Sequence, residues 1–389
     1  QRVAVKQVKA DAAAALDGDG LRARLEKLFG EPLSELVFAR RVAAWLADAA
    51  AHGDDLLLAR DYAAWAALAP KGRHAHGGGV LFKAPEKVEA EHLIRPLKTE
   101  RADGVARHEV DPAHWRRREG FALTDPGADL TGALDQAHYC IWCHHQGKDS
   151  CSTGLREKAP AAGVKAPFKS NSFGVKLAGC PLDEKISEMH VAKVAGWSLA
   201  ALAIVEVDNP MVPATGHRIC NDCMKSCIFQ KQDPVNIPQV ETRVLKDVLE
   251  LPWGFEIYSL LTRWNPLNVE RPLPRAPSGR RVLVVGMGPA GFTLAHHLLN
   301  DGHSVVGVDG LKIEPLAPEH NGVGVGGGRV PFAPVRDVRQ LYEALDERTM
   351  AGFGGVAEYG ITVRWDKNFL KIVRLVLERR EHFALYGGV

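Results

Sequence analysis

The chain has 389 residues, of which 46% are hydrophobic and 25% are charged. One hydrophobic core rarely organises so long a chain, so we expect several domains, and the composition argues against a disordered or fibrous protein. Lysine and arginine (49) nearly balance aspartate and glutamate (47), so the sequence lacks the bulk charge of proteins that bind nucleic acid. The longest strongly apolar run, 194–205, is shorter than the roughly 20 residues that cross a bilayer, and no signal segment opens the chain. We therefore expect a cytoplasmic protein without membrane insertion.

Residues 1–125 are predicted to form a mainly helical region whose role the sequence does not indicate. Its apolar residues recur at near-helical spacing. They are Leu21, Leu25, Leu28, Leu33, Leu36, Val37 and Leu46. The segment 61–68 predicts another packed helix. Residues 71–79 include three consecutive glycines and predict a loop, in which His74 and His76 are interpreted as exposed side chains rather than metal ligands.

Residues 126–265 contain every cysteine of the chain. The cysteines form a CxxC pair, a single cysteine seven residues further on, a Cys-Pro dipeptide and a CxxCx3C triplet. They are Cys140, Cys143, Cys151, Cys180, Cys220, Cys223 and Cys227. An odd number of cysteines in a large chain without a secretory signal argues against disulfides. CxxC pairs place two thiolates at the ends of a short turn, where both can bind one metal centre.

Two kinds of centre compete for these thiols. Structural zinc takes four cysteine or histidine ligands. The histidines near enough in sequence are His144, His145, His190 and His217. Iron–sulfur clusters take thiolates from CxxC runs that include a Cys-Pro, which suits Cys180-Pro181 and the triplet better. The spacing favours iron–sulfur clusters, and zinc remains the alternative.

A proline-rich connector, 266–280, precedes the start of an α/β domain at 281–389. The run 282–285 predicts a buried strand, a glycine loop follows, and a helix from Ala290 to about Leu299 leads to a second strand that ends in Asp309. The apolar side of this helix is expected to carry Leu294, Leu298 and Leu299.

The loop has the GxGxxG pattern of dinucleotide-binding Rossmann-like domains. Its residues are Gly286, Gly288, Pro289, Ala290 and Gly291. The first two glycines form a tight turn that lets the backbone approach a pyrophosphate, and the third lets the helix pack against the strand. Asp309 stands where a ribose hydroxyl needs an acceptor. A second glycine-rich stretch, 321–329, is interpreted as a surface loop.

The order of these motifs resembles that of the glutamate synthase small (β) subunit and of the N-terminal half of dihydropyrimidine dehydrogenase. The resemblance covers roughly residues 132–389. Three segments carry it: 179–182 (GCPL), 233–241 (DPVNIPQVE) and 354–361 (GGVAEYGI). The third is similar to a segment that lines the flavin in that family, with Thr362 in place of the usual proline. The resemblance implies FAD bound by the glycine loop and by Gly354, Gly355, Tyr359 and Gly360.

The same resemblance implies two [4Fe–4S] clusters with interleaved ligands. The implied ligands of the first cluster are Cys140, Cys143, Cys151 and Cys227. Those of the second are Cys180, Cys220, Cys223 and an oxygen of Glu241. Gln239 competes for this last position and His217 does so more weakly. The gap before Cys151 is longer than is usual in the family.

The expected fold is multidomain: a helical N-terminal region, an α-helical two-[4Fe–4S] domain and the start of a Rossmann-like FAD-binding domain. The expected function is an oxidoreductase that relays electrons between NAD(P)H, FAD and the clusters to an unknown acceptor on a partner subunit or domain. No catalytic side chain is expected. Two alternatives stay open: an electron-transfer adaptor without substrate chemistry, and a zinc-stabilised nucleotide-binding protein. Because no second Rossmann fingerprint follows and the chain opens with Gln1, we expect a fragment whose missing part binds NAD(P)H.

Overall fold

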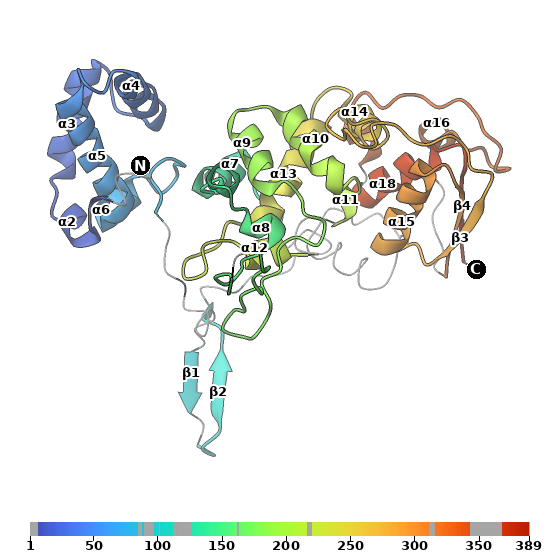
Figure 1. Ribbon diagram of the computed structural model, residues 1–389, viewed down its shortest axis with the longest axis horizontal. Coiled ribbons are helices and arrows are strands. Elements are labelled where there is room, and N and C mark those ends of the chain that lie inside the picture. Colours follow the sequence, from blue (N-terminus) through green and yellow to red (C-terminus); the bar gives the residue numbers. More distant parts are fainter. Residues whose placement is uncertain are drawn as a thin grey trace.

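The computed structural model describes most of the chain in three bodies. The described residues are 7–84, 88, 97–100, 102–112, 115, 126–161, 163–215, 220–310, 316–342 and 368–388. An N-terminal helical body, a central helical body with long loops and a C-terminal α/β unit follow one another along the long axis of the molecule (Figure 1). Among the described helices, none combines the length and the apolar character needed to span a bilayer.

The N-terminal body packs short helices around an aromatic core. Its helices are α2 (Ala10–Ala14), α3 (Gly18–Phe29), α4 (Glu35–Ala47), α5 (Gly53–Leu68) and α6 (Pro70–Ala75). The Asp17 side chain accepts a hydrogen bond from the Gly20 N–H at 3.0 Å and so caps α3, and Ser34 caps α4 in the same way. The buried aromatic side chains of this core are Phe29, Phe38, Trp45, Tyr62, Trp65 and Phe82. The predicted helix at 61–68 is confirmed as the second half of α5.

Of the residues at near-helical spacing, Leu25, Leu33 and Val37 are buried, whereas Leu28, Leu36 and Leu46 are at least half exposed. Two details of the prediction for this body are wrong. Residues 70–75 form a helix instead of a loop, with Pro70 at its first turn, where proline is tolerated. His76 is half buried instead of exposed, since its Nε2 lies 3.0 Å from the Tyr62 hydroxyl and its ring packs edge-on against Phe82.

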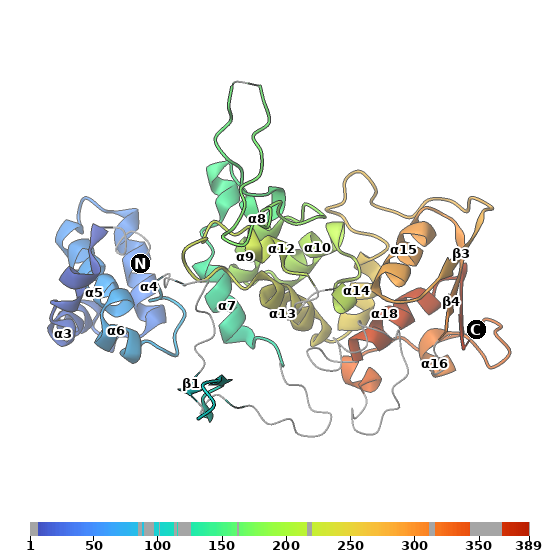
Figure 2. The same ribbon diagram turned by 90° about the horizontal axis from the view of Figure 1, so that it is seen from below.

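The central body is a set of helices around α13. They are α7 (Leu130–Tyr139), η3 (Cys143–Gln146), α8 (Ser150–Thr153), α9 (Ile186–Val194), α10 (Ser198–Asp208), α11 (Val212–Thr215), α12 (Asp222–Lys225), α13 (Ile237–Leu249) and α14 (Gly254–Leu261). Helix α13 contacts α7, α10, α11 and α14 and buries most of its length. Between the first two bodies, β1 (Leu97–Glu100) and β2 (Ala106–Glu109) pair as an antiparallel hairpin. The long loop 154–179 doubles back on itself and projects from the central body (Figure 2).

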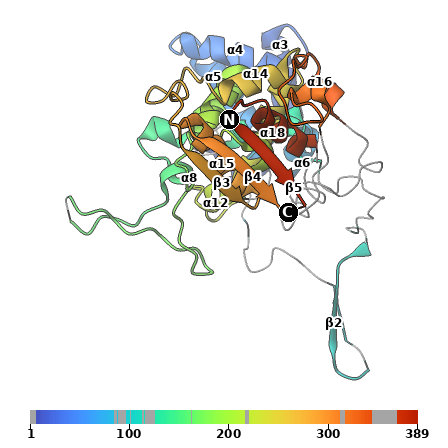
Figure 3. The same cartoon turned by 90° about the vertical axis from the view of Figure 1, so that its right-hand side faces the viewer.

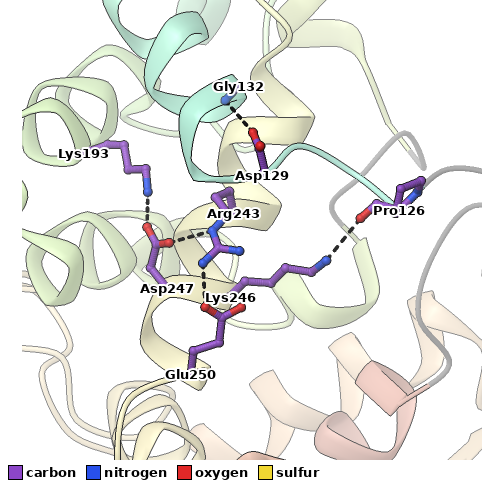
Figure 4. A network of polar contacts seen from close by, with 8 residues as sticks. All are labelled: Pro126, Asp129, Gly132, Lys193, Arg243, Lys246, Asp247 and Glu250. Atoms are coloured by element: carbon purple, nitrogen blue, oxygen red, sulfur yellow. Dashed lines mark hydrogen bonds and ion pairs between the residues drawn. The ribbon is translucent and has the colours of Figure 1, made fainter. Parts of the chain in front are cut away.

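A buried polar network joins α9 to α13 (Figure 4). The Lys193 ammonium, of which 3% is exposed, pairs with the Asp247 carboxylate. The other oxygen of Asp247 accepts from Arg243 Nε at 2.7 Å, and Arg243 also reaches Glu250 at 2.7 Å. Two helices of the central body are therefore held in register by charges that are almost completely removed from water.

The α/β unit is a three-stranded parallel sheet with helices on one face. Its elements are β3 (Arg281–Val285), α15 (Pro289–Asn300), β4 (Ser304–Asp309), α16 (Pro318–Asn321), η4 (Val338–Leu341), α18 (Asn368–Glu378) and β5 (Phe383–Gly387). The strand order is β3-β4-β5, with Val282 opposite Val305 and Val306 opposite Ala384. Helices α15 and α18 lie between the sheet and the central body (Figure 1), and the view in Figure 3 faces the strands.

Two expectations for this unit are only half right. Strand β3 buries Val284, but Leu283 and Val285 on its other face are 62% and 77% exposed. In α15 the buried side includes Phe292 and Leu299, whereas Leu294 is half exposed. The apolar pattern predicted the strand and the helix, but it did not predict which of their side chains are buried in the described structure.

One hydrophobic core runs through both the central body and the α/β unit. It includes Val244 of α13, Phe255 of α14, Phe292 of α15 and Phe369 of α18, all almost fully buried. Polar contacts cross the same boundary, among them Arg379, whose guanidinium lies 2.8 and 3.0 Å from the Glu256 carboxylate oxygens. The N-terminal body has a separate core.

Candidate cluster and nucleotide sites

Four cysteines from separate elements line one small cavity of the central body. Cys140 directly follows α7, Cys143 opens η3, Cys151 lies in α8 and Cys227 follows α12. These are the four thiols that the sequence assigned to the first cluster. The long gap before Cys151 is accommodated by a loop that returns α8 to the same cavity.

The turn between the first two cysteines has an unusual backbone. Trp142 adopts a left-handed conformation, with φ of 54°, which is rare for a bulky residue. Its indole N–H donates to the Ala137 carbonyl at 3.2 Å, and its backbone N–H points to the Cys140 sulfur at 3.4 Å. The CxxC turn is thus anchored to the end of α7, and an N–H is directed at a candidate ligand sulfur.

Burial makes these thiols hard to ionise on their own. Cys140, Cys151 and Cys227 are at most 7% exposed. Desolvation raises the pKa of Cys143 to about 11, and it also raises the pKa of Cys151 and Cys227. Thiolate is the form that binds metals, so a positively charged centre in the cavity is what would stabilise it.

The second predicted set also converges on one place. Cys180 follows the long loop, Cys220 and Cys223 lie at the start of α12, and Glu241 projects from α13. The pKa of Cys223 is raised first by burial and then by the charges of its neighbours. Those neighbours are Glu241, Glu184, Cys180 and Cys220. Three thiols and the predicted carboxylate are therefore brought together.

A second carboxylate beside this set was missed. Glu184 is 8% exposed, and burial together with the nearby charge of Glu241 raises its pKa. Burial likewise raises the pKa of Glu241, which accepts a hydrogen bond from Asn209 Nδ2 at 2.8 Å. The only sequence signal for Glu184 was its position four residues after Cys180 on the same loop.

The competing eighth ligands differ in where they lie. The side-chain oxygen of Gln239 accepts the backbone N–H of Ala128 and is thereby engaged outside the thiol set. His217 lies outside the described residues. Among the described residues, Glu241, as predicted, and Glu184 are the carboxylates beside the second thiol set.

The two thiol sets are adjacent and share elements. The backbone N–H of Cys180 donates to the Cys151 carbonyl at 2.8 Å, so a residue of each set meets across one hydrogen bond. Gly179 has φ of 85°, and a Cβ at this position would lie 2.5 Å from backbone atoms of Ser152 and Gly154. Only glycine permits this close crossing.

Within the part of the chain that the structure describes, no three His, Cys, Asp or Glu side chains are placed to hold one metal ion. Zinc takes four ligand atoms about 2.0–2.3 Å from one point, whereas a cubane spreads its thiolates over separate irons. The imidazole of His144 bonds the Ser187 hydroxyl at 2.7 Å and takes no part in a zinc-like set.

The glycine loop between β3 and α15 is a tight turn. Gly286 has φ of 90°, and a Cβ on Gly291 would overlap the carbonyl oxygen of Gly286, so the helix packs tightly against the turn. A Cβ on Gly288 would meet no atom within 4 Å, which leaves the loop open on that side. Helix α15 starts at Pro289, and its N-cap residue, Gly288, provides no side chain to accept from the first N–H groups of the helix.

Asp309 lies at the carboxyl end of β4 beside this loop, as predicted. One of its carboxylate oxygens accepts the Met287 N–H at 2.8 Å, so the side chain also fastens the glycine turn to the neighbouring strand. The other predicted flavin contacts, Gly354, Gly355, Tyr359 and Gly360, lie outside the described residues. The glycine loop and its terminal acid are thus brought together, and the remaining predicted contacts stay predictions.

Comparisons with known proteins give partial similarities. No protein-family model matches the chain. It is 55% identical over 179 residues to an uncharacterized protein of Rickettsia prowazekii, which covers 46% of this chain and 24% of the relative. It is 30% identical over 128 residues to the small chain of NADPH glutamate synthase from Mycobacterium tuberculosis, covering 33% of this chain and 23% of the relative. The corresponding Bacillus subtilis protein is 28% identical over 194 residues, or 49% and 34% of the two lengths.

The chain spans less than two thirds of each of these relatives. The similarity is to glutamate synthase small chains and, at this identity and coverage, supports an oxidoreductase in general terms.

Proposed function

We propose that this chain is the cluster-carrying and flavin-binding part of an oxidoreductase with two [4Fe–4S] clusters. The first cluster would be held by Cys140, Cys143, Cys151 and Cys227. The second would be held by Cys180, Cys220, Cys223 and a carboxylate, for which Glu241 is the predicted ligand. The observation that carries the proposal is that four thiols from four separate elements line one buried cavity.

The residues of the chain have distinct tasks in this proposal. The thiols would bind the clusters, and burial keeps water from the sulfur atoms of Cys140, Cys151 and Cys227, whereas Cys220 is exposed. The open backbone at Gly288 and the uncapped start of α15 would receive the FAD pyrophosphate, while Asp309 fastens the turn. When bound, FAD accepts two electrons together and releases them singly, which is what one-electron clusters require.

The electron donor is proposed by analogy. The glutamate synthase relatives are NADPH-dependent by name, and the chain covers a minor part of their length. We therefore propose NAD(P)H as the source of electrons in the full-length protein and a partner subunit or domain as the acceptor.

The test is metal and sulfide analysis of anaerobically purified protein. We expect about eight iron atoms and eight acid-labile sulfides per chain, following the ligand count. Cys140→Ser with Cys227→Ser should lose about half of both, and Cys180→Ser with Cys223→Ser should lose the other half. Stoichiometric zinc without sulfide would overturn the proposal in favour of a zinc-stabilised nucleotide-binding protein.

A further inference from the structure

A histidine and a serine face the first thiol cavity with unused hydrogen-bonding groups. His190 of α9 is 0% exposed, and neither of its ring nitrogens has a hydrogen-bond partner within the described residues. The hydroxyl of Ser150, at the start of α8, is also buried and also lacks a hydrogen-bond partner within the described residues. Both residues line the cavity that the four cysteines surround.

The other described residues that line the cavity form no hydrogen bond with the His190 ring or the Ser150 hydroxyl. They are mainly apolar, among them Ile141, Phe229, Val235 and Ile237. The hydroxyl of Ser187 also faces the cavity, but this group already bonds the His144 ring at 2.7 Å and the Asp149 carboxylate at 3.2 Å. Within the residues that the structure describes, neither the His190 ring nor the Ser150 hydroxyl therefore has a hydrogen-bond partner.

A hydrogen-bond donor that is buried without an acceptor destabilises the folded protein. A buried polar group without a partner costs about 1–3 kcal/mol. A neutral imidazole always carries one N–H, whichever tautomer it adopts. A protonated imidazole carries two, so the ring has a donor in either state. The sulfur atoms of a cluster held by the four cysteines are acceptors of the right kind in the right cavity.

We infer that His190, assisted by Ser150, donates a hydrogen bond to a sulfur atom of the first cluster and thereby raises its reduction potential. This inference rests on the proposed function, because it needs a cluster in that cavity. Reduction adds negative charge to the cluster, so a donor stabilises the reduced form more than the oxidised form. His190 is in this sense a tuning residue and not a ligand.

The experiment is a redox titration of the full chain followed by electron paramagnetic resonance. His190→Phe removes the donor, and His190→Gln keeps an N–H in a side chain of similar reach. We expect His190→Phe to shift the potential of one cluster to more negative values by about 59 mV, which is tenfold in a one-electron equilibrium constant. His190→Gln should recover most of that shift, and Ser150→Ala should shift the same cluster by less.

A second readout and a matched control separate this role from a structural one. Nitrogen-15 labelling of histidine should change the weak nitrogen coupling to the reduced cluster in the native protein, and this coupling should vanish in His190→Phe. His296→Phe is the control, because His296 is equally buried but lies in α15, away from the cavity. It should leave both potentials unchanged.

The possible failures are distinguishable. If native protein holds no iron and sulfide, the proposed function is wrong and the inference falls with it. If both clusters assemble in His190→Phe with unchanged potentials and nitrogen coupling, the inference alone is wrong. If both His190 variants lose half of the iron, His190 is a ligand or a structural residue, and its assignment as a donor is overturned.

Discussion

The most consequential single contact outside the candidate sites is the ion pair between Lys193 and Asp247. Both side chains are at most 9% exposed. Asp247→Asn would leave the Lys193 charge buried without its partner, which typically costs about 3–5 kcal/mol. We expect a loss of this size in urea unfolding. Glu250→Gln removes the exposed partner of Arg243 and should cost less than about 1 kcal/mol. Equal losses of unfolding free energy in Asp247→Asn and Glu250→Gln would show that the buried pair does not help to hold α9 against α13.

Glu206 makes stability depend on pH. Its two carboxylate oxygens are buried without a partner in the described structure, and burial raises its pKa well above the usual 4.5. The folded state therefore holds this proton more tightly than the unfolded state, so its contribution to stability is lost as pH rises above about 4.5. Glu206→Gln should raise the melting temperature at pH 8 more than at pH 5. The exposed Glu319→Gln should show no such difference. A larger gain for Glu206→Gln at pH 5 would contradict this prediction.

Single residues also show what the sequence could and could not reveal about the sites. Cysteine is rare and its spacing is regular, so each predicted thiol was identifiable, and the structure groups the thiols in the expected two sets. Glu184 and Ser150 were not assigned there, and His190 was considered only as a possible zinc ligand. Their distinguishing property is burial beside a thiol set, and no periodicity in the sequence records it.

At the scale of elements, the glycine loop allows a sharp comparison. Gly291→Ala would drive a methyl group into the Gly286 carbonyl and should lower the melting temperature of the protein without any ligand. Gly288→Ala meets no atom within 4 Å and should fold normally. Because its methyl group would occupy the space proposed for the pyrophosphate, Gly288→Ala should instead reduce bound FAD. Thermal unfolding and flavin content separate the two effects, and normal FAD binding by Gly288→Ala would contradict the proposed position.

The type of an element was easier to predict than its orientation. Helical spacing indicated α3, α4 and α5, yet half-exposed Leu28 and Leu36 show that spacing alone does not reveal which side meets a neighbour. The hairpin of β1 and β2 was missed because its strands, LKTE and ARHE, are short and charged and lack an apolar alternation. Helix α6 was missed because its six residues, PKGRHA, show no apolar pattern and three consecutive glycines follow shortly after them; the helix packs against α5.

At the scale of the whole molecule, the two cores predict two unfolding events. The N-terminal body has its own core, whereas the central body and the α/β unit share one. Calorimetry should therefore show one transition for the N-terminal body and a second for everything from α7 onward. Added FAD should raise the midpoint temperature of the second transition only. Separate transitions for the central helices and the sheet would contradict a shared core.

The shared core could not be foreseen from the sequence. Composition indicated a helical preface, a cysteine-rich stretch and a nucleotide loop in that order. The exposed proline-rich segment 266–280 suggested a tether between independent parts. Phe255 belongs to the same core as Phe292 and Phe369. These residues lie far apart in the chain, so no local sequence pattern predicts that they pack in one core.

That proline-rich segment is fastened at both ends. Asn265 donates to the Ala203 carbonyl at 2.8 Å, and the Arg275 N–H donates to the Asn300 carbonyl at 2.8 Å. It therefore wraps around an interface that packing has already fixed and does not act as a hinge. In the proposed relay, motion of this segment would therefore not change the distance between the flavin and the clusters. Exchanging the solvent-facing prolines for serines should leave the transfer rate untouched.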